Sequence, residues 1–305
     1  MTQPARPTVD IAICTFRRPQ LRQTLASVAA LETEGLAVRV IVSDNDTGPS
    51  AQALIEAERG AFPFPLTYLH SPAQNISLAR NACLDAATAD FIAFVDDDET
   101  VTPGWLTALI AQAEATGADV VLGPVRALYG EDSPPWIARG DFHSVKPVFV
   151  GDQIETGYTC NALIRRTPAV APLRFDLTLG RSGGEDTDFF YRLHARGSRI
   201  AYAPEALVEA VVPGHRARLS WLISRRFRAG QTHGLCLMRV RRVSALQAAG
   251  LASAKVVHCL VMTSVTVLSP VRWRRNLLRA TLHMGVLGGI LGVRQQVQYG
   301  HAQYR

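Results

Sequence analysis

Acidic residues are missing from the last third of the chain. All 26 Asp and Glu of the 305 residues lie before residue 210, where 17 Lys and Arg leave a net charge of −9. Residues 210–305 contain 15 Lys and Arg and no acid. This asymmetry indicates an anionic partner for the basic region. A basic surface that only balances the acidic part is the alternative.

Cysteine is also scarce. The five cysteines are widely spaced, odd in number and without a C-x-x-C pair. This pattern argues against a disulfide framework and a zinc site and favours a reducing compartment. The N-terminal residues 1–7 are few and polar, so we expect no signal peptide. The cysteines are Cys14, Cys83, Cys160, Cys236 and Cys259.

Two nucleotide-binding signatures are absent as well. No G-x-G-x-x-G follows the first expected strand, and no Walker sequence occurs. Both absences disfavour a dinucleotide-binding or P-loop fold.

Short apolar runs alternate with helix-patterned segments in the first half of the chain. With 48% apolar and 19% charged residues, this rhythm predicts an α/β fold with a parallel sheet covered on both faces. A further helix is expected with Thr102 as its N-cap, an irregular loop over 124–153, and a helix over 185–196. Strands are expected at 9–14, 38–43, 66–69, 91–95 and 118–122, and helices at 19–31, 49–59 and 76–87.

The strongest chemical signal is a run of carboxylates after an apolar strand. Residues 91–95 are apolar, and Asp96, Asp97, Asp98 and Glu99 follow them. Ligands of open α/β sheets bind at this end of the strands. Adjacent carboxylates repel one another unless a cation offsets the repulsion, so we expect Mg²⁺ or Mn²⁺ shared with substrate phosphates. An exposed acidic turn that caps the next helix is the alternative.

A second acidic group lies at the start of the helix expected over 185–196. Gly183 and Gly184 allow close backbone approach to a ligand, and Glu185 and Asp186 follow them. The helix N-terminus stabilises their charge, which suits a catalytic base and equally suits an acidic helix cap. Arg80, on an earlier helix, could pair with a diphosphate or with the acids themselves.

Polar groups also follow the first two strands. Thr15 and Arg17 follow the first strand, and Asp44 follows the second. Their side chains would line the same sheet edge and could hold a nucleoside.

The character of the chain changes after Pro213. Two apolar stretches, 243–268 and 277–293, flank the basic and aromatic segment 272–275. We interpret them as membrane-attached helices that lie in, or dip into, the inner leaflet. Two ordinary core helices are the alternative.

Together these motifs resemble the family 2 glycosyltransferases of the GT-A fold. Residues 9–19, 40–46, 75–81, 94–98 and 184–186 match that family's motifs in order. The acidic motifs and the Arg-rich C-terminal region are most similar to the ExoM-type glucosyltransferases of succinoglycan biosynthesis. The resemblance implies a Rossmann-like, mostly parallel sheet in a catalytic domain over 1–212, and a basic helical membrane-association region over 213–305.

The resemblance also implies roles for single residues. Asp44 would contact the uracil and Thr15 the nucleoside, with Arg17, Arg80, Asp96 and Asp97 completing the donor site. Asp98, Asp96 and His215 would hold the metal. Asp186 would be the catalytic base, with Glu185 beside it.

The implied activity is that of an inverting, metal-dependent enzyme. It would move a sugar, with glucose the first choice, from a UDP-sugar to a lipid-linked saccharide of exopolysaccharide biosynthesis. It would act at the cytoplasmic side of the inner membrane, attached peripherally or inserted shallowly, and would not bind nucleic acid.

Three other classes are alternatives to this interpretation. A haloacid-dehalogenase-like phosphatase or phosphotransferase uses Asp-x-Asp-x-Thr, which 96–100 satisfies, but needs a basic residue, usually Lys, and this chain has only Lys146 and Lys255. A non-catalytic saccharide- or nucleotide-binding scaffold would not need Asp186. A nucleotidyltransferase would carry an early Gly-rich loop with a nearby Lys.

Overall fold

A seven-stranded sheet forms the centre of the molecule. The computed structural model describes residues 6–241 and 243–295. The strand order is β11-β6-β10-β4-β1-β2-β3. Neighbouring strands run parallel except for β10, which is antiparallel to β4 and β6, so the expected mostly parallel sheet is mixed. The strands are β1 (Thr8–Thr15), β2 (Ala37–Asp44), β3 (Leu66–His70), β4 (Phe91–Asp96), β6 (Val120–Leu122), β10 (Asn161–Arg165) and β11 (Ile200–Tyr202).

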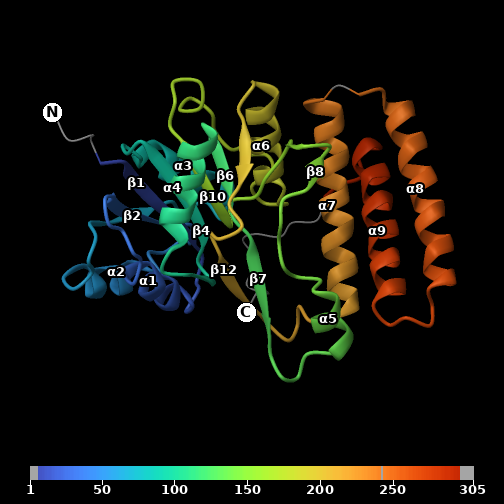
Figure 1. The fold of residues 1–305 in the computed structure, drawn as a ribbon, viewed down its shortest axis with the longest axis horizontal. Coiled ribbons are helices and arrows are strands. Elements are labelled where there is room, and N and C mark those ends of the chain that lie inside the picture. The colour runs from blue at the N-terminus through green and yellow to red at the C-terminus, as the bar shows by residue number, and fades with distance from the viewer. Residues whose placement is uncertain (1–5, 242, 296–305) are drawn as a thin grey trace.

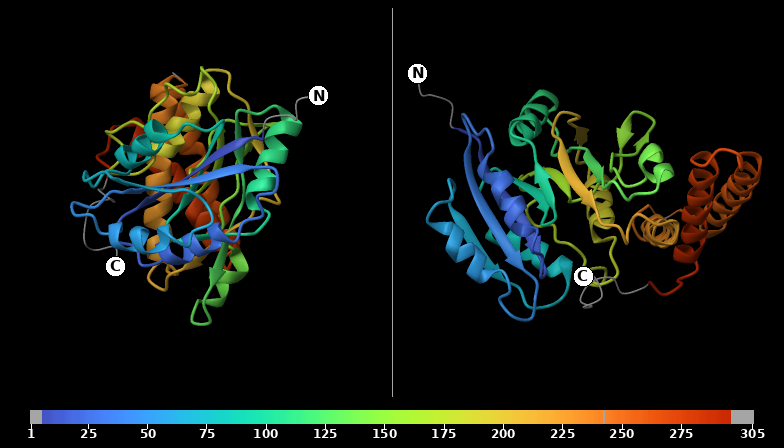
Figure 2. Two further views of the ribbon diagram at one scale, coloured as in Figure 1. Left: turned by 90° about the vertical axis from the view of Figure 1, so that its left-hand side faces the viewer. Right: turned by 90° about the horizontal axis from the view of Figure 1, so that it is seen from below.

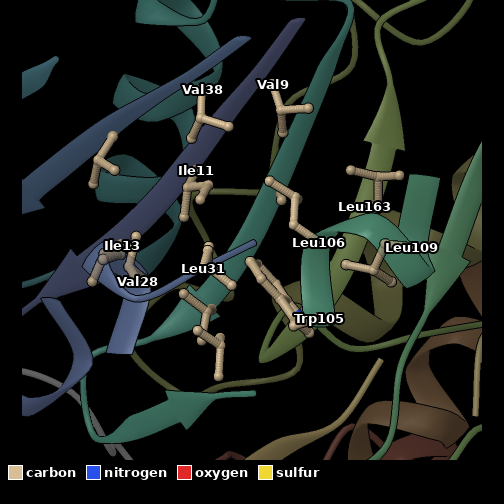
Figure 3. Close-up of a cluster of buried hydrophobic side chains, with 14 of the residues drawn as sticks. Val9, Ile11, Ile13, Val28, Leu31, Val38, Trp105, Leu106, Leu109 and Leu163 are labelled. Carbon is tan, nitrogen blue, oxygen red and sulfur yellow. The ribbon is translucent and has the colours of Figure 1, made fainter. Parts of the chain in front are cut away.

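Helices cover both faces of this sheet because its strands are apolar on both sides. Val9, Ile11 and Ile13 of β1 point to one face and join the core beneath Trp105 and Leu106 (Figure 3). The intervening positions of the strands build a second core on the other face. On the first face lie α1 (Leu21–Ala29), α2 (Gln52–Arg59) and α4 (Trp105–Thr116), and on the second α3 (Ile76–Ala86) and α6 (Glu185–Ala195).

A smaller sheet lies where an irregular loop was expected. The order is β5-β12-β7, and β7 pairs in parallel with β12 from Val125↔Val208 to Tyr129↔Val212. The expectation of a loop over 124–153 was wrong because the partner strand lies about 80 residues further along the chain, where local pattern cannot disclose it. The elements of this region are β5 (Glu99–Val101), β7 (Val125–Tyr129), α5 (Pro135–Gly140), β8 (Phe149–Val150), β9 (Gln153–Ile154) and β12 (Val208–Val212).

The expected N-cap at Thr102 is also corrected. Helix α4 begins at Trp105, with Gly104 at its N-cap. The Thr102 hydroxyl donates instead to the Leu207 carbonyl at 3.0 Å, which fixes the chain next to β12.

One buried side chain joins the two sheets. The Asn161 amide donates to the carbonyls of Pro124 and Ala206 at 2.9 and 2.7 Å, and its oxygen accepts from the Trp105 indole at 2.8 Å. A Cβ at Gly123 would lie 2.4 Å from that amide nitrogen, so only glycine fits there. The start of β10 is therefore tied to both sheets.

Three long helices form a layer at one end of the molecule, away from α1 and α2 (Figures 1 and 2). They are α7 (Leu219–Arg239), α8 (Ala245–Val265) and α9 (Arg272–Ile290), and α9 lies between the other two. A Cβ at Gly285 would lie 2.1 Å from the Phe227 carbonyl oxygen, and one at Gly230 would lie 2.0 Å from that of Leu282. Glycines thus bring the backbones of α7 and α9 together.

The two apolar stretches of the sequence differ in how they pack within this layer. The glycine-rich face of α9 packs on α7, so much of the second stretch serves helix packing. Among the residues described, α8 is the one helix long and apolar enough to cross a membrane. The segment 272–275 is used in part inside the protein, since Arg274 stacks on Trp136 of α5 with its guanidinium carbon 4.4 Å from the ring centre.

Candidate active site

The ends of three strands meet at one edge of the main sheet. Thr15 pairs with Asp44 at the ends of β1 and β2, and Cys14 pairs with Asp96 between β1 and β4. Because β10 runs the other way, its first residue, Asn161, lies opposite Val95 at the same edge. The sheet therefore brings the residues predicted to bind the nucleoside and the acidic residues at the end of β4 to the same edge.

Asp97 points inward and fastens this edge together. Its carboxylate accepts from the Thr15 hydroxyl at 2.7 Å and from the Phe16 amide at 3.3 Å. Burial, reinforced by the charge of Asp98, raises the pKa of Asp97 to about 7. Two residues predicted to bind the donor are thus bonded to each other and hold the first strand to the acidic turn.

Asp96 and Asp98 are the more open members of the acidic run. Their side chains are 45% and 25% exposed. Arg18 and Arg216 approach the Asp98 carboxylate to 3.7 and 3.9 Å, from β1's end and from the segment before α7. Desolvation raises the pKa of Asp96 to about 6, although nearby Arg80 opposes the shift. Asp96 and Asp98 therefore face the space in which an anionic ligand would meet arginines.

The second acidic group lies against the first. Arg80 of α3 forms a buried ion pair with Glu185 and comes within 3.9 Å of Asp96. Burial raises the pKa of Glu185 to about 7, against the opposing effect of Arg80. The negative charge of Asp186 also contributes to the raised pKa of Asp96. The structure thus brings Arg80, Asp96, Glu185 and Asp186 together. Of the two kinds of partner that the sequence left open for Arg80, the structure shows the acids.

The N-terminus of α6 fixes the position of Asp186. The backbone amide of Thr187 donates to Asp186 Oδ1 at 2.7 Å. Gly184 has φ of +93°, and a Cβ there would lie 2.3 Å from the Thr232 hydroxyl of α7. Glycine is therefore required where the helix start meets α7.

Side-chain contacts within the protein hold the turns after β1 and β2. Arg17, with φ of +53°, pairs with Asp46 at 2.7 Å. Asp44 is fully buried, and its carboxylate accepts from the Ala51 amide at 2.8 Å and from the Tyr68 hydroxyl at 3.0 Å. The observed role of Asp44 is to hold this turn and the start of α2.

The predicted metal ligands do not form a complete cage. Within residues 6–241 and 243–295, no three His, Cys, Asp or Glu side chains gather as a metal-binding group. His215 is exposed, and its neighbour Arg216 is the residue that reaches Asp98. Asp96 and Asp98 still supply the hard carboxylate oxygens that Mg²⁺ and Mn²⁺ prefer, and such ions commonly use one or two carboxylates plus substrate phosphates.

Two basic residues of the site were missed by sequence reasoning. Arg18 follows Arg17, to which the donor-binding role was given, and Arg216 follows His215. Both pair with Asp98. The signal for Arg18 was its position directly after a strand end, whereas Arg216 enters only because the chain returns to this edge after β12.

A family model and known proteins match this chain. The model of the family described as Glycosyl transferase family 2 matches residues 10–170. Succinoglycan biosynthesis protein ExoM of Rhizobium meliloti (strain 1021) is 52% identical over 297 residues, which cover 96% of each chain.

Solved structures show the same fold. The mannosyltransferase PcManGT from Pyrobaculum calidifontis, in complex with GDP-Man and Mn²⁺, superposes with a TM-score of 0.63 at 15% identity, over 95% of this chain and 88% of that one. S. aureus TarS 1-349 gives 0.52 at 15% identity, over 97% of each chain. The expected GT-A-like fold is thus confirmed, and its central sheet, expected to be mostly parallel, is mixed through β10.

Proposed function

The chain belongs to glycosyl transferase family 2, and we propose that it transfers glucose from UDP-glucose to a lipid-linked saccharide with inversion at the anomeric carbon. The observation that carries the proposal is the convergence at one sheet edge of Asp96 at the end of β4, Asp98 in the turn after it, and Asp186 in the first turn of α6. The similarity to the succinoglycan protein supports an exopolysaccharide acceptor.

The donor would lie across the ends of β1 and β2. The turn held by Asp44 would support the uracil, beside Thr15 and Arg17, while Asp96 faces the ribose. Arg18 and Arg216, now within 4 Å of Asp98, carry charge suited to a diphosphate. Arg80 would keep the acids apart by pairing with Glu185.

Asp98, with Asp96 beside it, would hold Mg²⁺ or Mn²⁺. When bound, the ion offsets negative charge on the departing nucleoside diphosphate. Arg18 and Arg216 would add fixed positive charge on the same side. His215, which the structure leaves exposed next to Arg216, is the least supported member of this set.

Asp186 would accept the proton of the acceptor hydroxyl. That oxygen then forms its bond to the anomeric carbon while the bond from this carbon to the diphosphate breaks on the opposite face. The Thr187 amide orients the carboxylate. A single displacement of this kind inverts the configuration of the sugar.

The two parts of the chain would have different functions. Residues 1–212 would form the catalytic domain, and residues 213–305 would hold it at the cytoplasmic side of the inner membrane. The basic composition of the second part supports this placement, because the lipids of that leaflet and a diphosphate-linked acceptor are both anionic.

Release of UDP tests the proposal. Purified full-length protein would receive UDP-glucose, Mn²⁺ or Mg²⁺ and a membrane lipid extract, alongside Asp98→Asn and Asp186→Asn. We expect metal-dependent release that falls by roughly 10²-fold or more in both variants. Asp85→Asn is the matched control, because Asp85 is 62% exposed and pairs with Arg174 away from the site.

The other outcomes are equally informative. Release of phosphate from simple esters, without UDP release, would identify a phosphatase. Binding of UDP-glucose that survives Asp186→Asn without turnover in the unchanged protein would identify a scaffold.

A further inference from the structure

An apolar ridge on the outside of α8 has no part in the proposed mechanism. Leu246, Val257, Val261 and Val265 are 84%, 62%, 55% and 70% exposed, and Leu268, just beyond the helix, is 96% exposed. Val257, Val261 and Val265 lie on one side because residues four apart share a helix face, and Leu268 follows in the turn after the helix. The 18-residue apolar window of α8 has a mean hydropathy of 1.5 and is 17% buried. Figure 1 shows α8 as the outermost helix of its layer.

Positive charge accompanies the ridge. Desolvation lowers the pKa of His283 on α9, and the charges of Lys255 on α8 and Arg279 on α9 add to the effect. The three residues stand on two helices that pack on each other. No Asp or Glu occurs in residues 210–305 to neutralise them. Lys255 lies on the side of α8 that packs on α9, because it is three residues after the buried Ala252 and four before the buried Cys259. The ridge is thus an apolar helix face on a basic helical layer whose sequence holds no acid, and this combination matches an anionic phospholipid surface.

The packing of α8 decides its orientation. Helix α9 flanks it, and the amide of Asn276 donates to the Met262 carbonyl at 3.2 Å. A spanning α8 would carry Arg279 and His283 of α9 into the hydrocarbon, where charge is costly. An α8 that lies flat keeps these groups at the level of the headgroups.

We propose that α8 lies in the plane of an anionic bilayer leaflet, with its ridge among the acyl chains and Lys255 and Arg279 at the phosphates. The inference deepens the proposed function by naming the element and lipid charge that place the site at the membrane. The inference rests on the proposed function only for the reason why the protein would bind a membrane. Its test does not need the proposed acceptor, because lipid binding is measured without substrate.

Vesicle flotation tests this proposal on the full-length protein. Vesicles of phosphatidylcholine with 30 mol% phosphatidylglycerol are compared with phosphatidylcholine alone, at low and high salt. We expect binding to the anionic vesicles, with loss on the order of tenfold in the Val257→Asp, Val261→Asp double variant. Lys255→Gln with Arg279→Gln should weaken binding and flatten its salt dependence. Val148→Asp is the control, since Val148 is 69% exposed far along the chain from α8.

Specific results would overturn the proposal. Equal flotation of the ridge variant and the unchanged protein would remove α8 from the contact. A dimer that becomes a monomer in the ridge variant, without vesicle binding by either, would identify a second copy as the occupant. Resistance of the membrane-bound protein to alkaline carbonate extraction would identify a spanning helix. If the unchanged protein floats with the anionic vesicles but releases no UDP, the proposed function alone is refuted.

Discussion

The ion pair between Arg80 and Glu185 fixes the charge at the centre of the site. Both side chains are almost fully buried, at 7% and 2% exposure. A buried charge that loses its partner is costly, whereas loss of both charges together costs much less. The pair therefore links the stability of the protein to the arrangement of its acids.

A double-mutant cycle measures that link. We expect Arg80→Met to lower the free energy of unfolding by roughly 3 kcal/mol or more, because Glu185 is left unpaired. Adding Glu185→Gln to Arg80→Met should restore part of the loss. Urea unfolding at pH 7.5 gives the four values, and losses that simply add would show that the two groups do not interact.

At the residue scale, the acids of the site and Arg80 were predictable, and the arginine partners of Asp98 were not. Asp96 and Asp98 follow a buried strand, and Asp186 follows two glycines at a helix start, so local pattern marks them. Arg216 joins Asp98 only through the path of β12 back to the sheet edge. Asp97 was predicted to bind the donor, yet its place is set by the Thr15 hydroxyl, a tertiary contact.

At the element scale, the loop after α5 is clamped to α7 by one imidazole. The His143 ring stacks on Trp221 of α7 with ring centres 5.3 Å apart, and its Nε2 donates to the Arg216 carbonyl at 3.0 Å. Burial lowers the pKa of His143 to about 4, and Arg225 and Arg216 add to the effect. The neutral ring is thus part of the joint between these elements.

Acid should weaken this joint. The unfolded chain takes up a proton near the usual pKa of about 6.5, whereas the folded His143 resists protonation down to about 4. Its contribution is complete above pH 6.5 and declines as the pH falls through this window, by roughly 2 kcal/mol at pH 5. Urea unfolding from pH 7.5 to 5 should show a steeper loss in the unchanged protein than in His143→Asn, and parallel curves would contradict the assignment.

The glycines of the helical layer allow a matched comparison. Gly285 touches the backbone of α7, whereas a Cβ at Gly250, on α8, would meet nothing within 4 Å. We expect Gly285→Ala to destabilise the protein by roughly 1–3 kcal/mol through overpacking. Gly250→Ala should stabilise it by up to about 1 kcal/mol through helix propensity. Thermal unfolding of both variants measures the difference, and two shifts of the same sign would contradict the packing described.

Elements with strong periodicity were predicted closely, and elements defined by distant partners were not. The strand expected at 91–95 is β4, and the helix expected over 185–196 is α6, because each carries its own apolar pattern. β7 needs β12 before it is a strand, and the glycines of α9 have meaning only against α7. The apolar stretch 277–293 therefore indicated a membrane contact, whereas its glycines pack on α7 in the structure.

At the scale of the whole molecule, the helical layer completes a core that begins in the first 212 residues. Ile137, Phe142 and Val212 are buried together with Leu222 of α7 and Leu278 of α9. Gly184, at the start of α6, lies against Thr232 of α7. The proposed boundary between residues 212 and 213 would therefore separate two functions, whereas the packed core continues across it.

Truncation tests this dependence. A fragment of residues 1–212 would expose the apolar side chains that α7 and α9 cover, so we expect aggregation and no cooperative thermal transition, beside a cooperative transition of the full chain. Size-exclusion chromatography and circular dichroism make the comparison. A monomeric fragment with a sharp transition would show that the first part folds independently.

Asn161 has a consequence for the cooperativity of folding. Its three hydrogen bonds join it to α4, to the segment after β6 and to the segment before β12, so the side chain is fully satisfied only when all three are in place. A partly assembled chain that buries β10 without these neighbours leaves a polar amide unsatisfied, at a cost of about 1–3 kcal/mol. Intermediates that contain only the central strands are disfavoured by that amount. The amide thus makes the completion of one sheet conditional on the other, and sharpens the transition between the unfolded and the folded chain.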